Sequence, residues 1–432
     1  MLDIKSAADA CEKAIAGLGA KKYSFSTVEG ETREFNVDGG KFTLFRTLFD
    51  NAVSITLYRD GRKGSAVTNR FEEDAIVRAA ADADSAAQAA DADEAWDIAP
   101  KYDFPVKHDG VYDADLDLLF SRTRELLEDI KTNHPKIIVE QLIVAHSRSH
   151  RIYRNSNGTV YENFSGEYEV SVMFSAHEGE ESTSFFGSGF TTLSLDRPFI
   201  ELSSLERDLT DVENQLNPRK LEGKFTGTMI LTPATLNEFM GNIIGNFASD
   251  GVILDETSIW REKLGEKVAD ERITVTVDPR HESVVCGENM TAEGFPSASF
   301  DLIKDGVLKN FHLSLYVSNK TGFDRAPCSS LPCIIKAGDT PLDEIIASTE
   351  HGIIVGRFSG GEPGISGDFS GVAKNSFLVE GGKITGAVSE AMISGNLAQM
   401  RNDLIAVSRE TVSDGDGIAP YMAFGGITVS GK

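Results

Sequence analysis

Glu238 is the residue with the clearest potential for chemistry, because it lies between two amide side chains on a predicted helix. Asn237 precedes it directly and Asn242 follows four residues later. This order matches the pattern His-Glu-x-x-x-His, with Asn in the place of each His. In that pattern two neutral imidazoles bind Zn²⁺ and the glutamate acts on the metal-bound water. An amide oxygen is a much poorer zinc ligand, so these residues alone favour an ordinary amphipathic helix.

The helix that would carry these side chains is predicted over residues 233–249. Thr232 is a hydroxyl N-cap, and Pro233 suits the first helical position. A wide apolar stripe then repeats at helical spacing. Its members are Leu236, Phe239, Met240, Ile243, Ile244 and Phe247. The stripe should face a core, with the polar residues beside it.

Other metal-ligating residues are few, with eight His and four Cys in the chain. Cys328 and Cys333 are separated by four residues; we favour a structural role for them and keep a metal or redox role as the alternative. His146 and His150 lie in a strand-like segment where both can face one way. No carboxylate completes an obvious triad there, and nearby arginines disfavour a cation. No P-loop, dinucleotide fingerprint or Gly-x-Ser-x-Gly elbow is present.

The balance of charge limits the kind of partner. The chain of 432 residues carries 67 acidic and 42 basic side chains, a formal net charge of −25. Such a surface would repel phosphates, so we expect no nucleic acid partner. The first 20 residues lack the apolar core of a signal peptide, and no run approaches the roughly 18 apolar residues that span a bilayer. We therefore expect a cytoplasmic protein that does not associate with membranes.

Residues 1–220 are predicted to form an N-terminal α+β domain. Helices are expected at 1–20, 71–96 and 113–131. Strands are expected at 22–28, 33–37, 41–49, 52–59, 137–146, 151–155, 160–164 and 168–177. The acidic, Ala-rich helix at 71–96 is interpreted as a solvated helix face, with an acidic docking surface as the alternative.

Residues 221–432 are predicted to form a largely β, barrel-like C-terminal domain that contains the helix at 233–249. Gly381-Gly382 marks a hairpin. The charged stretch 205–220 is interpreted as a helix and linker between the two domains. Strands of the second domain are expected at 226–231, 271–277, 299–303, 311–315, 352–358 and 375–380.

Four further segments follow one another in order between residues 54 and 431. They are a strand and turn at 54–69, a hairpin at 304–311, the stretch 364–397 and the ending 420–431. The third is the most specific, with a Gly-Asp-aromatic-Ser run at 367–370 and Gly-Asn-Leu at 395–397. In this order the segments resemble the TldD/PmbA family and, within it, the PmbA (TldE) side.

The resemblance implies how the motif should be interpreted. TldD-like members are zinc peptidases that use the two His of the motif and a Cys near the C-terminus. The matching positions here are Asn237 and Asn242, with Glu238 retained, and the Cys region matches about 411–414, which holds no Cys. With all three ligands missing, we expect no metal or other cofactor in this chain, no catalytic residue, and zinc in the partner subunit.

The leading hypothesis is a non-catalytic subunit that pairs with a TldD-like zinc metalloprotease and acts on unfolded proteins or peptides, including leader peptides. A loop with Gly364, Gly367, Asp368 and Ser370 would line the peptide cavity. One alternative is an autonomous metallopeptidase with an unrecognised site. Another is a regulator of the type named modulator of DNA gyrase. The resemblance also implies a dimer, either with the TldD-like partner or, in isolation, with a second copy.

Overall fold

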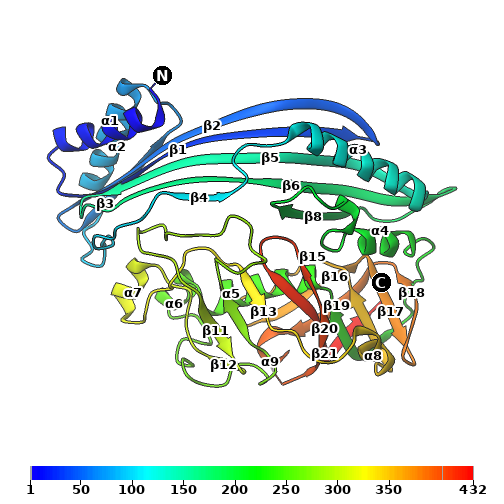
Figure 1. Ribbon diagram of the computed structural model, residues 1–432. Helices are drawn as coiled ribbons and strands as arrows, with labels where there is room; N and C mark the ends of the chain where they lie inside the picture. Colours follow the sequence, from blue (N-terminus) through cyan, green and yellow to red (C-terminus); the bar gives the residue numbers. More distant parts are fainter. Residues whose placement is uncertain (1, 401, 432) are drawn as a thin grey trace.

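The computed structural model describes residues 2–400 and 402–431. A long, arched sheet lies over a second sheet formed by the C-terminal half of the chain (Figure 1). The α+β class, with a largely β second half, is confirmed. The domain boundary at residue 220 stays a prediction; the first sheet ends at Thr192 and the second begins at Lys224.

Four antiparallel strands of 17 to 19 residues form the body of the first sheet. They are β1 (Lys22–Asp38), β2 (Lys41–Arg59), β5 (Ile137–Asn155) and β6 (Val160–Glu178). The eight-stranded sheet has the order β3-β2-β1-β5-β6-β4, with β7 and β8 paired to β6. The short strands are β3 (Arg62–Thr68), β4 (Lys107–Gly110), β7 (Glu181–Ser182) and β8 (Phe186–Thr192).

Each of these long strands was predicted as two short ones, and that division is wrong. Polar residues between the predicted pieces favoured a break, for example at Glu29–Thr32. The backbone nevertheless stays paired there, since Gly30 lies opposite Asp50 on one side and Ser149 on the other. Continuous pairing satisfies the backbone whatever the side chains are, so polar residues do not end the strand.

Helices α1 (Ile4–Gly17) and α2 (Glu73–Ala89), which lie within the helices predicted at 1–20 and 71–96, pack at one end of the long sheet (Figure 1). The close approach of α2 to β3 requires Gly64, and the alanines on the inner face of the helix are buried: Ala75, Ala79, Ala80, Ala83 and Ala87. A Cβ at Gly64 would lie 2.1 Å from the Ala83 carbonyl oxygen and 2.1 Å from the Ala87 nitrogen. Asp82 remains exposed, whereas Asp84 is buried and pairs with Arg59.

The second sheet has 13 strands arranged around β21 (Ile418–Ser430), which pairs with β9, β13, β19 and β20. Its main path is β12-β11-β10-β13-β21-β9-β14-β17-β18. The other strands are β9 (Lys224–Leu231), β10 (Val275–Val277), β11 (Phe300–Lys304), β12 (Val307–Leu308), β13 (Cys333–Ile335), β14 (His351–Val355), β15 (Arg357–Ser359), β16 (Asp368–Lys374), β17 (Ser376–Glu380), β18 (Lys383–Val388), β19 (Ala391–Asn396) and β20 (Leu404–Ser413).

The remaining helices are shorter or lie against these sheets. They are α3 (Leu116–Asn133), η1 (Phe199–Glu201), α4 (Leu205–Glu213), α5 (Pro233–Phe247), α6 (Asp250–Leu254), α7 (Leu315–Thr321), α8 (Leu342–Ala347) and α9 (Leu397–Met400). No helix in the described part of the chain is both long and apolar enough to cross a membrane.

The strand predicted at 311–315 is wrong. Phe311 and Leu313 are buried, which gives the alternation of a strand, but only His312 makes a bridge, to Ser249. Ser314 then caps α7 by accepting a hydrogen bond from the Val317 N–H. A hydroxyl N-cap competes with further strand pairing.

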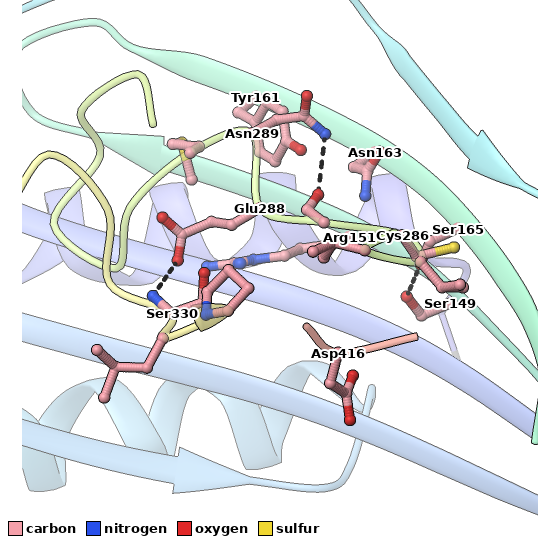
Figure 2. Close-up of a pocket in the computed structure, with 16 residues that line it drawn as sticks. Ser149, Arg151, Tyr161, Asn163, Ser165, Cys286, Glu288, Asn289, Ser330 and Asp416 are labelled. Atoms are coloured by element: carbon pink, nitrogen blue, oxygen red, sulfur yellow. Dashed lines mark hydrogen bonds between the residues drawn. The ribbon is translucent and has the colours of Figure 1, made fainter. Parts of the chain in front are cut away.

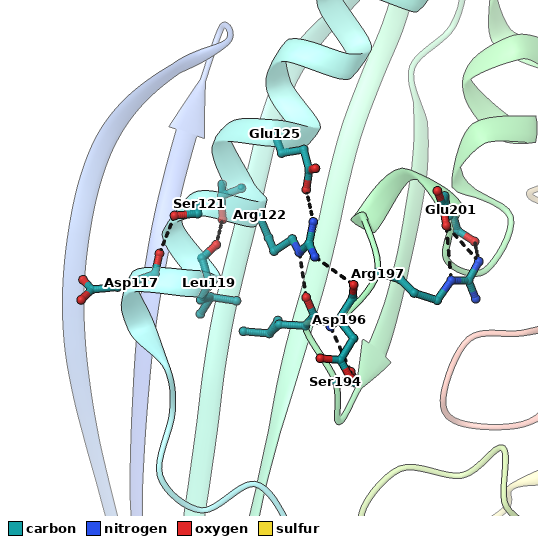
Figure 3. Close-up of polar contacts among 11 residues, drawn as sticks. Asp117, Leu119, Ser121, Arg122, Glu125, Ser194, Asp196, Arg197 and Glu201 are labelled. Atoms are coloured by element: carbon teal, nitrogen blue, oxygen red, sulfur yellow. Dashed lines mark hydrogen bonds and ion pairs between the residues drawn. The ribbon is translucent and has the colours of Figure 1, made fainter.

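Arg122 on α3 holds the segment that leads from β8 to η1 (Figure 3). Its Nε donates to the Leu195 carbonyl at 2.7 Å, and a terminal nitrogen donates to the Asp196 carbonyl at 2.9 Å. A second terminal nitrogen pairs with Glu125. One planar guanidinium thus fixes two consecutive carbonyls that otherwise lack a strand partner.

Replacing Arg122 with Ala should lower the free energy of unfolding by about 2 kcal/mol, because two charge-assisted hydrogen bonds to backbone are lost. Arg122→Lys should restore only part of this, since an ammonium does not reproduce the fork. Chemical denaturation measures both variants. Arg124→Ala, at an exposed position on the same helix, is the control, and an equal loss there would contradict the assignment.

Candidate functional site

Helix α5 begins as predicted and packs its apolar stripe into the core of the second half. The Thr232 hydroxyl accepts from the Thr235 N–H, and Pro233 occupies the first turn. Phe239 packs edge-to-face on Phe358 and Phe369, with ring centroids 5.3 Å apart in both pairs. The position of the polar residues on α5 is therefore fixed by buried contacts.

Asn237 and Asn242 do not converge on one point. Five residues on a regular α-helix correspond to a rotation of about 140° between the two side chains. The Asn237 Oδ1 is buried and has no hydrogen-bond partner among the described residues. The Asn242 Nδ2 instead donates to the Glu238 carbonyl of its own helix at 3.1 Å. The two amides thus occupy different environments.

Glu238 lies on the exposed side of α5. Partial desolvation raises the pKa of this carboxyl, Glu362 raises it further, and Arg357 opposes both effects. Arg357 itself lies over the Phe185 ring, 4.7 Å from its centroid. Glu238 is therefore a carboxyl beside a second acid and one arginine, without an imidazole or thiol near it in its described contacts.

The region matched to the third zinc ligand is held elsewhere. Thr411 to Ser413 pair with β21, and the Asp414 carbonyl accepts from the Thr191 N–H at 2.8 Å. None of the hydrogen bonds described for this segment reaches α5. In residues 2–400 and 402–431, no group of three or more His, Cys, Asp or Glu is placed to hold a metal ion. The donor set at α5, two amides and one carboxyl, does not fit Zn²⁺.

The loop predicted to line a peptide cavity is partly structural. The Asp368 carboxylate accepts from the Asn396 Nδ2 at 2.7 Å and from the Ser366 hydroxyl at 3.0 Å. Asp368 also lines a surface hollow of about 380 Å³ together with residues of β19 and β21. Gly364, Gly367 and Ser370 are not among its described lining residues. A role of this loop in peptide binding stays a prediction.

The scattered Cys and His residues are used within the fold. Cys328 and Cys333 are free thiols, and burial raises the pKa of Cys328 to about 12 and of Cys333 to about 11. His146 Nε2 bonds the Val111 carbonyl at 2.6 Å, and His150 Nε2 bonds Glu162 at 2.9 Å. These contacts agree with the structural interpretation of each residue.

Two carboxyls on α4 were missed by the sequence prediction, which placed a charged helix and linker there. Asp208 and Asp211 lie one turn apart beside the N-terminus of α5 and line a small cavity of about 40 Å³. Burial raises the pKa of both to about 6. The Ser188 and Ser204 hydroxyls donate to Asp208. Their i, i+3 spacing is the only signal in the sequence.

A larger cavity of about 520 Å³ lies where the long sheet meets the loops of the second half (Figure 2). Strands β5 and β6 contribute its wall, including Arg151 and Asn163, and the loops contribute Glu288 and Ser330. The sequence prediction considered arginines of β5 only as neighbours of histidines. The cross-strand neighbours of these arginines depend on the register of β5 against β6, which could not be predicted from the sequence.

Comparison with known proteins identifies the architecture. Two protein-family models match the sequence. The family model described as PmbA/TldA metallopeptidase C-terminal domain matches residues 223–431, and the family model described as PmbA/TldA metallopeptidase domain 1 matches residues 25–87. The TldE structure from Thermococcus kodakarensis covers 98% of this chain and 100% of its own, with a TM-score of 0.83 and 20% identity. The structure of a putative modulator of DNA gyrase from Bacteroides thetaiotaomicron covers 99% of this chain and 98% of its own, with a TM-score of 0.86 and 24% identity.

Curated relatives agree with the structural matches. Metalloprotease PmbA of Escherichia coli O157:H7 is 24% identical over 97% of this chain and 92% of its own length. The metalloprotease PmbA homolog of Haemophilus influenzae is 25% identical over 83% of this chain and 81% of its own length. A metalloprotease TldD homolog of the same species is 29% identical over 37% and 36%. The fold and the matched domains are thus those described by the two PmbA/TldA models.

The chain belongs to the PmbA/TldD family. Two of the curated relatives that match most of its length are named PmbA, in agreement with the resemblance in the sequence.

Asp208→Asn should make stability less dependent on pH. The folded-state pKa of about 6 lies above the unfolded value of about 4, because burial destabilises the ionised carboxylate. The folded wild-type protein therefore loses stability as the pH rises from about 4 to about 6. Asparagine cannot ionise, so the unfolding temperature of the variant relative to wild type should rise over that interval. Thermal unfolding at a series of pH values measures this, and a constant difference would contradict it.

Proposed function

We propose that this chain is a non-catalytic subunit of a two-chain, TldD-type zinc metalloprotease that acts on unfolded proteins or peptides. The observation that carries the proposal is the donor set of α5. Asn237, Glu238 and Asn242 occupy the motif positions with amides in place of imidazoles, and the two amides lie in different environments. These residues do not supply the ligands for a metal ion that would activate a water molecule, so we assign hydrolysis to the partner.

The partner we propose is a related chain of TldD type that carries the intact motif and the zinc. Both a PmbA homolog and a TldD homolog from Haemophilus influenzae match this sequence. This coexistence supports a pair of related chains with different roles. In such a pair the present chain would close one side of a chamber that holds the peptide, and the partner would cleave the peptide.

An unpaired strand edge supports a docking surface for that partner. Strand β3 pairs with β2 only from Val53 to Arg59, so residues 41–52 have no described neighbour on their outer side. We call residues 41–50 the apolar edge. Its large apolar side chains are exposed, with Phe49 at 74%. They are Phe42, Leu44, Phe45, Leu48 and Phe49.

Unpaired edges and contiguous exposed apolar side chains are both uncommon on isolated soluble proteins. A sheet edge of the partner that pairs with the apolar edge would satisfy its backbone and cover its phenylalanines. We therefore assign this edge to the TldD-like subunit. Self-association of the isolated chain would use the same surface.

Reconstitution tests the catalytic assignment. The purified chain should not cleave an unfolded peptide by itself, whereas its mixture with a TldD-like partner should. Glu238→Gln in this chain should leave the rate of the mixture unchanged, because Glu238 has no metal-bound water to activate. The matched substitution of the motif glutamate in the partner should abolish cleavage. Cleavage by the isolated chain would instead support the autonomous peptidase.

Substitutions at the apolar edge test the docking surface. Phe45→Glu combined with Phe49→Glu should weaken association with the partner, since two charges replace buried apolar area. Analytical ultracentrifugation measures the complex, and circular dichroism confirms that the chain remains folded. Val77→Glu, at a position 50% exposed on α2, is the control. Unchanged association of the edge variant would remove the edge from the interface.

A further inference from the structure

The cavity in Figure 2 is bounded by two parts of the chain that are distant in sequence. One wall comes from β5 and β6 of the long sheet. The other comes from the loops at 284–290 and 330–332, with Asp416 from the turn before β21. The volume of about 520 Å³ falls in the range of roughly 300 to 1,000 Å³ that holds small ligands. None of its described lining residues belongs to α5 or to the apolar edge.

Strand register explains why polar side chains line the sheet wall. Arg151 on β5 lies opposite Asn163 on β6, and Ser149 lies opposite Ser165. Alternate residues on a strand face the same side, so these two cross-strand pairs point together into the cavity. The two serine hydroxyls bond each other at 2.9 Å. Arg151 and Asn163 make no such bond.

Arg151 differs from the other arginines of its strand. Arg148 pairs with Glu31 and Asp113, and Arg154 pairs with Asp9 and Glu12. The Arg151 side chain makes no hydrogen bond or ion pair with any described residue, and its Nε is buried. The Nε of Arg154 is also buried without a partner, but the terminal nitrogens of Arg154 are paired. A buried donor on a cation that lacks an acceptor is costly to maintain for stability alone. It is expected where a ligand supplies the acceptor.

Two further polar atoms in the cavity are buried and lack partners among the described residues: the Asn163 Oδ1 and the Ser330 hydroxyl oxygen. Figure 2 shows Arg151 extending from the sheet toward the loops that carry Glu288 and Ser330. Donor and acceptor atoms from both walls are therefore available to one molecule in the cavity.

The loop wall is held in place before any ligand enters. The Glu288 carboxylate accepts from the Ser329 N–H at 2.9 Å and from the Ser330 N–H at 2.9 Å, and it also pairs with the Ser297 hydroxyl. A Cβ at Gly287 would lie 1.6 Å from the Pro279 carbonyl oxygen, so only glycine fits the close approach there. Such preorganisation lowers the cost of binding.

The surrounding charges select the ligand. Among the described lining residues Arg151 is the one cation, beside the carboxyls of Glu288 and Asp416. Asp109, which has Lys107 near it, bonds Asn289 behind the wall. Repulsion from these carboxyls grows with the charge of the ligand, so a carboxylate monoanion is favoured there over a phosphate dianion. A single carboxylate matches the planar guanidinium fork. A neighbouring N–H of the same molecule can donate to the Asn163 Oδ1.

We infer that this cavity binds a carboxylate carried by a peptide or an amino acid, with the Arg151 guanidinium as its anchor and Asn163 as the acceptor for an adjacent N–H. The inference goes beyond the proposed subunit role, because it concerns a site in this chain alone. The carboxylate has three possible sources: a peptide C-terminus, an acidic side chain, or a free amino acid.

Isothermal titration calorimetry of the full chain tests the inference without any partner subunit. The probes are trialanine, trialanine amide, N-acetyl-Ala-Glu-Ala amide, alanine and inorganic phosphate, each up to about 10 mM. At least one carboxylate probe should bind, and trialanine amide and phosphate should not. The carboxylate probe that binds identifies the source. Binding of none of the carboxylate probes, or equal binding of the amide or phosphate, would overturn the inference.

Variants assign the binding to the anchor. Arg151→Gln should weaken binding of the carboxylate probe about tenfold or more, because a charge-assisted bidentate contact is lost. Asn163→Asp, nearly isosteric, places a carboxylate opposite Arg151 and should block the site from within. Arg124→Gln removes the same charge from an exposed position on α3 and should bind like wild type. Normal affinity of both folded cavity variants would overturn the role of Arg151.

Discussion

The continuous backbone pairing of β1, β2, β5 and β6 is the constraint on which the other features depend. Inner strands such as β1 have a neighbour on both sides over most of their length. Their N–H and C=O groups are thus satisfied whether the side chains are apolar or charged. This freedom lets the same sheet bury Val53 and Ile55 under α1 and α2, and expose Phe49 at its outer edge. It also lets the sheet present Arg151 to the second half of the chain.

The long helices and the fold class could be predicted from the sequence because their signals are local. Thr232, Pro233 and the following apolar stripe identify α5, and the Ala-rich stretch at 71–96 identifies α2. The lengths of the long strands could not be predicted, because polar residues such as those at 29–32 resemble turns when pairing partners are unknown. The strand predicted at 311–315 was wrong for a different reason. Alternating burial of side chains indicated a strand there, but such burial also occurs in segments that do not pair with a neighbouring strand.

The candidate sites show the same limit. The motif positions on α5 were identified from residue order, and the structure adds that Asn237 and Asn242 lie in separate environments. The cavity around Arg151 could not be predicted from the sequence. Its wall depends on the register that places Arg151 opposite Asn163, and its other side is formed by loops more than a hundred residues later in the chain.

The apolar edge has a consequence for how the protein must be produced. A strand with free N–H and C=O groups and exposed phenylalanines is a template for any other extended chain, including partly folded copies of itself. Such templating grows with concentration and is fastest while chains are newly made. On the proposal that a partner covers the edge, a cell that makes this chain in excess of that partner would accumulate aggregates, so the proposal implies matched synthesis of the two chains.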